Sequence, residues 1–377
     1  MATVLTLHPE HGEVLRQIFL NAEAYWPAHL STASFFQEVH TQGMAPVLFR
    51  SIMERDASYW PAELLSSLKE TALRQAAAEL HIEAELRNLL KAFAQAGIQP
   101  LVLKGTALAY SIYPEPWLRP RCDTDLLVTE AERDKAEALL RHVGYAPLLA
   151  AHTEYLGTQK SYSRVSQGLR YTYDLHWQIS NTNRQFSHQF ADAQFFADVI
   201  SVPSLGDHAR SLSRVDSLIY ACFHRAGHFS HSGDRLVWLY DIHLLCQALT
   251  AQEATRFYSK AKQLEISTLC ADALAVTAFW FNTDMPAQLA TLMQETPRNE
   301  AFTVLLKPGG RQVGIKEHAL LELQGLPTER ERLRFLWQKA FPPPEFMLWR
   351  YKAAKRSALP WLYVRRLAEA LFIFLKR

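Results

Sequence analysis

Two carboxylates stand two residues apart in Asp123-Thr124-Asp125, directly before the apolar run 126–128. Residues two apart in a strand point to the same face, so Asp123 and Asp125 are expected to lie side by side. Carboxylates that close repel each other unless a cation or a proton lies between them. Asp oxygens suit Mg²⁺, which takes one or two protein carboxylates and keeps several waters. The two aspartates predict a site for Mg²⁺ or Mn²⁺. The alternatives are that they form a solvated surface pair or cap a helix, since both arrangements can have the same DxD pattern.

A third carboxylate, Asp174, occurs in the segment RYTYDLHW at residues 170–177. Strand alternation places Tyr171 and Tyr173 on one face of this segment, and Asp174 and His176 on the other. The aromatic face is expected to bury its area against helices, and Asp174 and His176 are expected at a cleft. A charge at a strand edge and a structural histidine are the simpler interpretations of each residue alone.

Lys104-Gly105-Thr106 separates the strand-like run 98–103 from a short helix expected over 107–113. A helix N-terminus with a glycine that lets the backbone come close is a phosphate-binding geometry. Thr106 is expected to donate its hydroxyl to a phosphate, and Lys104 to supply a positive charge. The GxxxxGK[ST] spacing of a P-loop is absent. An N-cap role for Thr106 and a solvated Lys104 are the alternatives.

Further basic and aromatic residues extend the possible nucleotide site. Arg119 and Arg121 lie in a loop marked by Pro114, Pro116 and Pro120 and are expected to neutralise a triphosphate. His224 and His228 are four residues apart on one helix face, where lining of a cleft or packing against each other is favoured over a zinc site. Arg235 follows and is expected either to reach a phosphate or to form an internal ion pair.

The fold expected from these patterns is α+β. Residues 1–97 read as helical, with a long helix from Pro61 to about Ala96. Residues 98–190 form a mixed α/β unit with a capping box at 129–132 and a hairpin whose turn is 166–168. Residues 191–377 return to helical patterning and end in a basic, aromatic tail. This tail is expected either to cover the core or to contact an anionic membrane surface or RNA.

The composition excludes several classes of protein. The chain has 377 residues, 49% of them hydrophobic, and 40 Lys and Arg stand against 38 Asp and Glu. It is therefore neither disordered nor a strongly basic nucleic-acid coat. The four cysteines lie far apart and form no CxxC pair, which favours a reducing compartment. No signal peptide and no apolar run long enough for a transmembrane segment is seen, so a cytoplasmic protein is expected.

The order of these segments resembles the polymerase-beta-like nucleotidyltransferase superfamily, and within it an uncharacterised nucleotidyltransferase family. The segments that carry the resemblance are HTQGMAPVLFRSI (40–52), LVLKGTALAYSIYPEPWLRPRCDTDLLV (101–128), YDLHW (173–177), HRAGH (224–228), RLVWLYDIHLL (235–245) and LRFLWQKAFPPPEF (333–346). The resemblance implies that Gly105 and Thr106 hold nucleotide phosphates. It also implies that Asp123 and Asp125 bind catalytic metals and that Asp174 is the third carboxylate.

The function expected is transfer of a nucleoside monophosphate from an NTP to an acceptor, with release of pyrophosphate and with two divalent cations bound by Asp123, Asp125 and Asp174. The acceptor stays open among a small molecule, a peptide, a protein side chain and an RNA end. Alternatives are a non-catalytic nucleotide-binding regulator or scaffold, a phosphotransferase that releases ADP, and a toxin-like enzyme that modifies tRNA.

Overall fold

The structure is a computed structural model of the chain. It divides into two compact units: the first unit comprises Met1–Thr124 and Phe195–Val313, and the second comprises Asp125–Gln194 and Gly314–Arg377. The three-region division at residues 97 and 190 stays a prediction. The residues that the structure describes are 7–20, 25–55, 57–148, 159–179, 198–228, 233–295, 300–306, 323, 326, 328–353 and 355–375.

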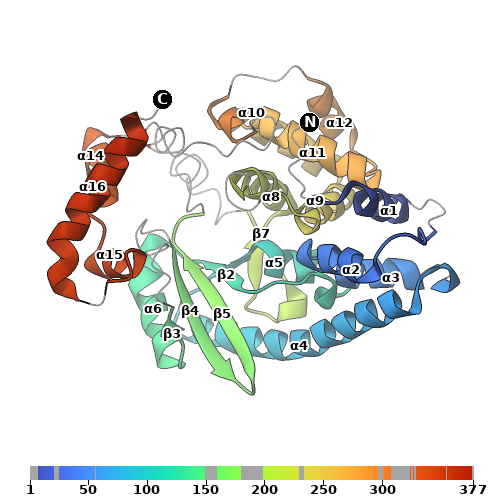
Figure 1. Cartoon of the computed structure of the whole chain (residues 1–377), viewed down its shortest axis with the longest axis horizontal. Coiled ribbons are helices and arrows are strands. Elements are labelled where there is room, and N and C mark those ends of the chain that lie inside the picture. The colour runs from blue at the N-terminus through green and yellow to red at the C-terminus, as the bar shows by residue number, and fades with distance from the viewer. Residues whose placement is uncertain are drawn as a thin grey trace. The chain divides into compact units, whose positions relative to one another are not determined.

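The first unit begins with helices, as the sequence predicts, and α4 (Ala62–Gln95) is the long helix in Figure 1. Pro61 directly precedes α4, and Gly97 follows it with a φ of 69°. A positive φ suits glycine, which has no Cβ to clash, so the helix ends where expected. The other helices of this part are α1 (Pro9–Phe19), α2 (Thr32–Thr41) and α3 (Ala45–Met53).

The apolar stripe of α4 is buried at its two ends and interrupted in the middle. Leu64 and Leu68 near its start, and Leu86, Leu90 and Phe93 near its end, are buried. Leu73 and Leu80, which the sequence also assigns to this stripe, are exposed. Leu73 lies five residues after Leu68, which turns it away from the buried face.

Three short strands lie in the first unit. β1 (Leu101–Leu103) pairs in parallel with β7 (Arg210–Leu212), and β7 pairs antiparallel with β6 (Val199–Ser201). Helical patterning was expected from about residue 192, so β6 and β7 correct that expectation. Each has only three residues, too few for a period of two to be distinguished from other patterns.

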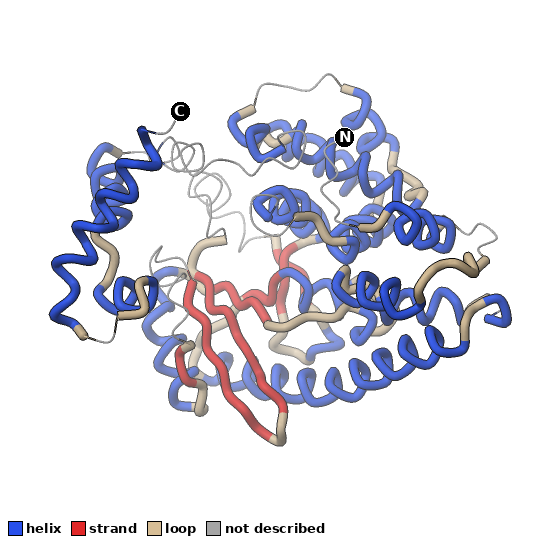
Figure 2. The backbone as a smooth tube through the Cα atoms, viewed as in Figure 1, coloured by secondary structure: helices blue, strands red, loops and turns tan. Residues whose placement is uncertain are grey.

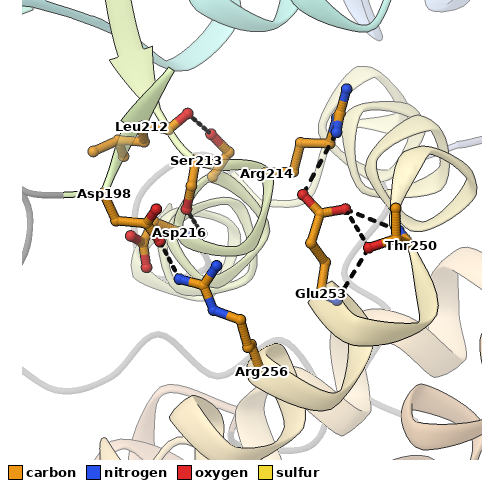
Figure 3. A network of polar contacts seen from close by, with 9 residues as sticks. Asp198, Leu212, Ser213, Arg214, Asp216, Thr250, Glu253 and Arg256 are labelled. Atoms are coloured by element: carbon orange, nitrogen blue, oxygen red, sulfur yellow. Dashed lines mark hydrogen bonds and ion pairs between the residues drawn. The ribbon is translucent and has the colours of Figure 1, made fainter.

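A polar network fixes the junction of β7 and α8 (Arg214–His228), as Figure 3 shows. The Ser213 N–H donates to the Asp198 carbonyl at 3.1 Å, and the Asp216 N–H donates to the Ser213 hydroxyl at 3.2 Å. Arg256, on α10 (Ala251–Gln263), forms an ion pair with the Asp198 carboxylate. Since Ser213 satisfies an N–H of the first turn, it sets where α8 begins.

Three helices of the first unit, α9 (Leu236–Ala248), α10 and α11 (Ser267–Phe281), pack against α8, which carries the fully buried Arg225. Its guanidinium donates to Asp234 at 2.8 Å and to Asp272 at 2.9 Å. Asp272 lies on α11, so this ion cluster ties the end of α8 to a neighbouring helix. The next helix, α12 (Ala287–Gln294), packs against α10 and α11.

The second unit contains four strands in the order β3-β4-β5-β2. β4 (Gln159–Ser166) and β5 (Leu169–His176) form the hairpin expected from the sequence, a two-stranded ribbon in Figure 2. The two turn residues, Gln167 and Gly168, both have positive φ, which fits a tight hairpin turn. The other strands are β2 (Thr124–Leu127), within which the boundary between the units falls, and β3 (Ala146–Pro147).

The capping box predicted at residues 129–132 is confirmed. The Thr129 N–H donates to the Glu132 carboxylate at 3.1 Å, and a 3-10 turn, Glu130–Glu132, leads into α6 (Arg133–His142). Alternation along β5 is also confirmed, because Tyr171, Tyr173 and Leu175 are buried. Thr172 and Asp174, which alternate with these three, are half-buried, whereas His176 at the end of the strand is buried too.

The second unit also contains the C-terminal helices α14 (Glu329–Ala340), α15 (Pro344–Arg350) and α16 (Leu359–Leu375). With its mixed sheet of seven strands and its many helices, the chain has the α+β fold expected. None of the described helices combines the length and apolarity that crossing a membrane requires. The 3-10 helices not yet named are Ala57–Tyr59, Pro116–Leu118, Pro203–Leu205, Ala301–Leu306 and Arg356–Ala358.

Candidate functional site

Two neighbouring strands of the second unit bring together Asp125, Asp174 and His176, which we call the carboxylate–histidine group. β2 carries Asp125, and β5 carries the other two residues. The Val128 N–H, just after β2, donates to the His176 carbonyl at 2.9 Å, which fixes the register of the strands. One ligand atom from each side chain of the group lies within 4.8 Å of the others. Two carboxylate oxygens and an imidazole nitrogen at this spacing suit a divalent cation.

His176 is the most deeply buried member of the group. Its side chain is fully buried, and its Nε2 lies 2.8 Å from Asp125 Oδ1. Its Nδ1 is also buried and has no hydrogen-bond partner among the described residues. The sequence expected His176 at the rim of a cleft, on the same face as Asp174. The structure places it instead directly against the second carboxylate of the DxD segment.

Asp174 is the more accessible carboxylate of the group. It is half-buried and accepts a hydrogen bond from the Gln159 side-chain amide at 3.3 Å, across the β4–β5 ladder. Asp125, in contrast, is only 5% exposed. Within this group, Asp174 is therefore the carboxylate better placed for a reactant that enters from solvent.

Asp123 lies in the first unit, just ahead of β2, and is exposed. Its carboxylate is one of the charges that raise the pKa of Arg119, so it lies in that guanidinium's field. Convergence of Asp123 with Asp125 and Asp174 on shared cations stays a prediction.

Gly105 and Thr106 open a helix, as predicted, but this helix, α5 (Lys104–Ser111), begins three residues earlier than expected. It follows β1 without a loop, and Lys104 takes a left-handed φ of 51° at the junction. That conformation is uncommon for a residue with a Cβ. The Thr106 hydroxyl donates to Thr124 Oγ1 at 3.2 Å. It thus ties the first turn of α5 to the start of β2.

The space beside Gly105 is taken by the Arg119 side chain. A Cβ added at Gly105 would lie 3.1 Å from the Arg119 guanidinium. Real Cβ atoms rarely come that close to another group, so the missing side chain gives Arg119 its place. Room for Arg119 is thus one explanation for a glycine at this position. The close approach of a phosphate, expected from the sequence, is a second explanation.

Arg119 forms a buried two-pronged ion pair with Asp241 of α9. Its Nε and Nη2 each donate to an Asp241 carboxylate oxygen at 2.8 Å, and Tyr113 donates its hydroxyl to the same carboxylate at 2.7 Å. Burial lowers the pKa of Arg119, but the charge and hydrogen bonds of Asp241 outweigh it and raise the pKa overall. Burial, followed by the charge of Asp241, also raises the pKa of Tyr113. The pair balances its own charge inside the first unit.

Arg121, the second arginine of the proline-rich loop, is paired with Glu79 of α4. Both side chains are about 95% buried, and the Tyr110 hydroxyl donates to the same glutamate. Burial, and then the charge of Glu79, raises the pKa of Tyr110. Sequence analysis missed Glu79 because it belongs to a helix rich in charged residues. Glu79 is seven residues from both Ala72 and Leu86, which are buried, so it lies on the same face of the helix as they do. This spacing could have identified Glu79 as a buried carboxylate.

A small cavity of about 40 Å³ lies in the first unit beside the start of α5. The residues of interest in its wall are Lys104, Gly105, Arg119, His224, Trp238 and Asp241. Three of these six were singled out as nucleotide-binding residues from the sequence, and a fourth is the predicted cleft histidine. The cavity combines aromatic rings with polar groups at the helix start, a typical composition for a small-molecule site.

The two helical histidines pack against Trp238. The ring centroids of His224 and His228 lie 4.4 Å apart, and those of His228 and Trp238 lie 4.8 Å apart. Arg235 donates to the Thr41 carbonyl at 2.9 Å and lies over the Trp238 ring. The sequence analysis considered an internal ion pair for Arg235. In the structure the ion pair with Asp241 is formed by Arg119.

Comparison with known proteins identifies the family of the chain. No curated protein matches it. A family model described as an uncharacterised nucleotidyltransferase matches residues 30–282, which include the start of α5, the carboxylate–histidine group and the helices that line the cavity. Since this match covers more than half of the sequence, the chain belongs to this uncharacterised nucleotidyltransferase family.

Proposed function

We propose that the protein is a metal-dependent nucleotidyltransferase. It would move the nucleoside monophosphate of an NTP such as ATP to an acceptor hydroxyl and release pyrophosphate. The observation that carries the proposal is the carboxylate–histidine group, whose ligand atoms lie within 4.8 Å of one another. Membership of a nucleotidyltransferase family supports the reaction class.

The two carboxylates of this group fit a hard divalent cation, because carboxylate oxygens are the ligands that Mg²⁺ and Mn²⁺ prefer. Asp125, Asp174 and His176 would hold one cation, and Asp123 would join Asp125 in holding a second. When bound, the cations would supply positive charge to the entering and leaving oxygens. Without a cation, His176 would hold Asp125 in place through their 2.8 Å contact.

Asp174 would act at the attacking oxygen. It is the half-buried member of the group, and a carboxylate within reach of the acceptor hydroxyl can accept its proton. Gln159 would keep Asp174 oriented through its 3.3 Å hydrogen bond. The acceptor itself, whether a small molecule, a peptide, a protein or an RNA end, is for experiment to identify.

The triphosphate would bind at the start of α5. The first N–H groups of a helix have no partner within the helix and carry its positive dipole end. Because the Thr106 hydroxyl already donates to Thr124, phosphate would be bound there mainly by the backbone N–H groups of Gly105 and Thr106. Lys104 and Arg235 would add positive charge. Arg119 and Arg121, each paired with a carboxylate, would contribute through their remaining N–H groups.

We also propose that the protein works in the cytoplasm. Its four cysteines form no disulfide, and Cys222, Cys246 and Cys270 are buried. Reduced cysteines are usual in a reducing compartment.

The test is an assay of the purified protein with each NTP labelled at the α-phosphate, Mg²⁺ or Mn²⁺, and cell extract. Transfer of the label to an acceptor, with pyrophosphate released in equal amount, is the result expected. Asp125→Asn should abolish the transfer. Asp134→Asn is the matched control, since Asp134 lies in the same unit with its side chain 85% exposed.

Release of ADP with transfer of the γ-phosphate would show a phosphotransferase instead. Nucleotide-dependent stabilisation of the fold without any turnover would show a regulator, because a ligand that binds the native state stabilises it by mass action.

A further inference from the structure

The C-terminal helical segment, α14, α15 and α16, has only a small core of its own. Phe346, Met347 and Leu362 are buried together, and neighbouring apolar side chains are partly buried against them. The Tyr363 hydroxyl donates to the Pro342 carbonyl at 2.6 Å, and the Arg366 Nε donates to the Lys339 carbonyl at 3.0 Å. These bonds join α16 to the end of α14 and the loop that follows it. The segment is drawn in red in Figure 1.

The same segment exposes an unusual amount of apolar surface. Eight of the fifteen exposed large hydrophobic side chains of the described residues belong to it, so the exposure is concentrated there. Three of the eight are tryptophans, and Trp337 and Trp361 are 65% and 67% exposed. A group of this size marks an interaction surface. The eight are Leu333, Leu336, Trp337, Phe341, Trp349, Trp361, Val364 and Leu367.

Most of these side chains form a stripe on each of the two longer helices. Leu333, Leu336 and Trp337 follow a spacing of three and four on α14, while Phe335 of that helix is buried. Trp361 and Val364 follow the same spacing on α16, which buries Leu362. Each helix therefore has an apolar face besides the one that fills the core. We call the two exposed faces together the apolar stripes.

Positive charge accompanies the apolar stripes. Residues 329–377 contain twelve Lys and Arg against four Asp and Glu, whereas residues 1–328 contain 28 against 34. Two of the four acidic residues, Glu345 and Glu369, already form ion pairs with Arg356 and Arg365 inside the segment. The charge of this segment is thus opposite in sign to that of the preceding chain and suits an anionic partner.

We propose that the C-terminal helical segment binds the surface of an anionic lipid bilayer, with α14 and α16 lying in its plane. The headgroup boundary takes aromatic rings, aliphatic side chains and basic residues together. RNA would use the aromatic rings and the positive charge, but it has no binding mode for aliphatic Leu333, Leu336 and Val364. A second copy of the chain would bring a like-charged segment to the same surface, which is unfavourable.

The proposal is independent of the transfer reaction and is tested on the full-length protein by sedimentation with vesicles. The protein should bind vesicles of phosphatidylcholine mixed with phosphatidylserine, and should bind pure phosphatidylcholine vesicles far more weakly. Added salt should weaken the binding, because it screens the attraction between the basic residues and the lipid headgroups. No binding to the phosphatidylserine vesicles would overturn the proposal.

Variants separate the two contributions to binding. Trp337→Ser/Trp361→Ser should lower the partition onto anionic vesicles by about tenfold or more, through loss of apolar area. Arg330→Gln/Arg334→Gln/Lys355→Gln should lower it by about fivefold for each charge removed. The matched control is Leu73→Ser/Leu80→Ser, which removes exposed leucines from α4 and should leave the partition unchanged.

Two further readouts use the same variants. Thermal unfolding should give similar midpoints for all of them, since each changes exposed side chains. Light scattering that shows a dimer which the tryptophan variant converts to a monomer would overturn the proposal in favour of self-association. Binding of a labelled RNA oligonucleotide without vesicle binding would overturn it in favour of RNA.

Discussion

The two units of the molecule use buried carboxylates in different ways. In the first unit, Asp241 meets the Arg119 guanidinium through two hydrogen bonds of 2.8 Å, and its charge is balanced. In the second unit, Asp125 and Asp174 gather around one imidazole, that of His176. A buried carboxylate paired with a guanidinium has its charge neutralised and stabilises the fold. Two carboxylates beside one imidazole instead provide ligand atoms for a cation. The comparison predicts that breaking the Arg119–Asp241 pair changes stability and that substituting Asp125 or Asp174 changes activity.

The largest effect is expected for Asp174→Asn. The neutral amide would neither hold a divalent cation nor accept a proton, so turnover should fall about ten-thousandfold or more, equivalent to about 5.5 kcal/mol. The midpoint of thermal unfolding without divalent ions should stay the same or rise, because repulsion between two carboxylates is removed. Pyrophosphate release and calorimetry measure the two effects. A variant that loses its fold but keeps its activity per folded molecule would contradict the comparison.

The next effect is expected for Arg119→Met, which leaves Asp241 buried without its guanidinium. Breaking a buried ion pair at one partner costs about 3 to 5 kcal/mol of unfolding free energy. The double variant Arg119→Met/Asp241→Leu should recover much of this loss, since no buried charge remains. Urea denaturation of the wild type and of the single and double variants gives the coupling energy. A coupling energy near zero would mean that the pair does not hold the first unit together.

His243 gives the first unit a half-buried histidine to compare with the fully buried His176. It lies on α9, its Nδ1 is 2.8 Å from the Thr283 hydroxyl, and burial lowers its pKa to about 4. The unfolded chain takes up this proton near pH 6.5 and the folded chain only near pH 4. The stability that His243 contributes is therefore complete above pH 6.5 and is lost as the pH falls toward 4.

The predicted size of this loss is about 3 kcal/mol, since one unit of pKa difference corresponds to about 1.4 kcal/mol. His243→Gln should remove that part of the pH dependence, whereas Asp134→Asn should leave it in place. Denaturant unfolding at a series of pH values measures both. Equal slopes for His243→Gln and the wild type would show that the fold does not hold this histidine in its neutral form.

The smallest effect on stability is expected for Gly105→Ala, which tests whether this glycine is needed for the fold or for phosphate binding. Gly105→Ala places a Cβ 3.1 Å from the Arg119 guanidinium, so it should lower the unfolding free energy by about 1 to 2 kcal/mol without any nucleotide. In an Arg119→Met background the same change should be neutral or slightly stabilising, because alanine favours helix over glycine. A variant of unchanged stability that has lost NTP affinity would assign the glycine to phosphate binding instead.

Local elements of the fold were predictable wherever a short pattern has one physical cause. The capping box at Thr129 and the hairpin turn at Gln167 and Gly168 are confirmed, because their hydrogen bonds and φ angles depend on neighbouring residues. β6 and β7 were missed because three-residue strands obtain their stability from pairing with other strands. Nothing in their own sequence separates them from the helical pattern around them.

Of the candidate site, the sequence by itself determined which side chains share a face of β5. Asp174 and His176 are two residues apart, and the strand period of two puts them together in any fold that keeps β5 a strand. Only the tertiary structure decided the partners. His176 meets Asp125 across 51 residues of sequence, and Arg119 meets Asp241 across 122. Many arginines and aspartates of the chain are chemically equivalent, so the pairs that form depend on which distant elements pack together.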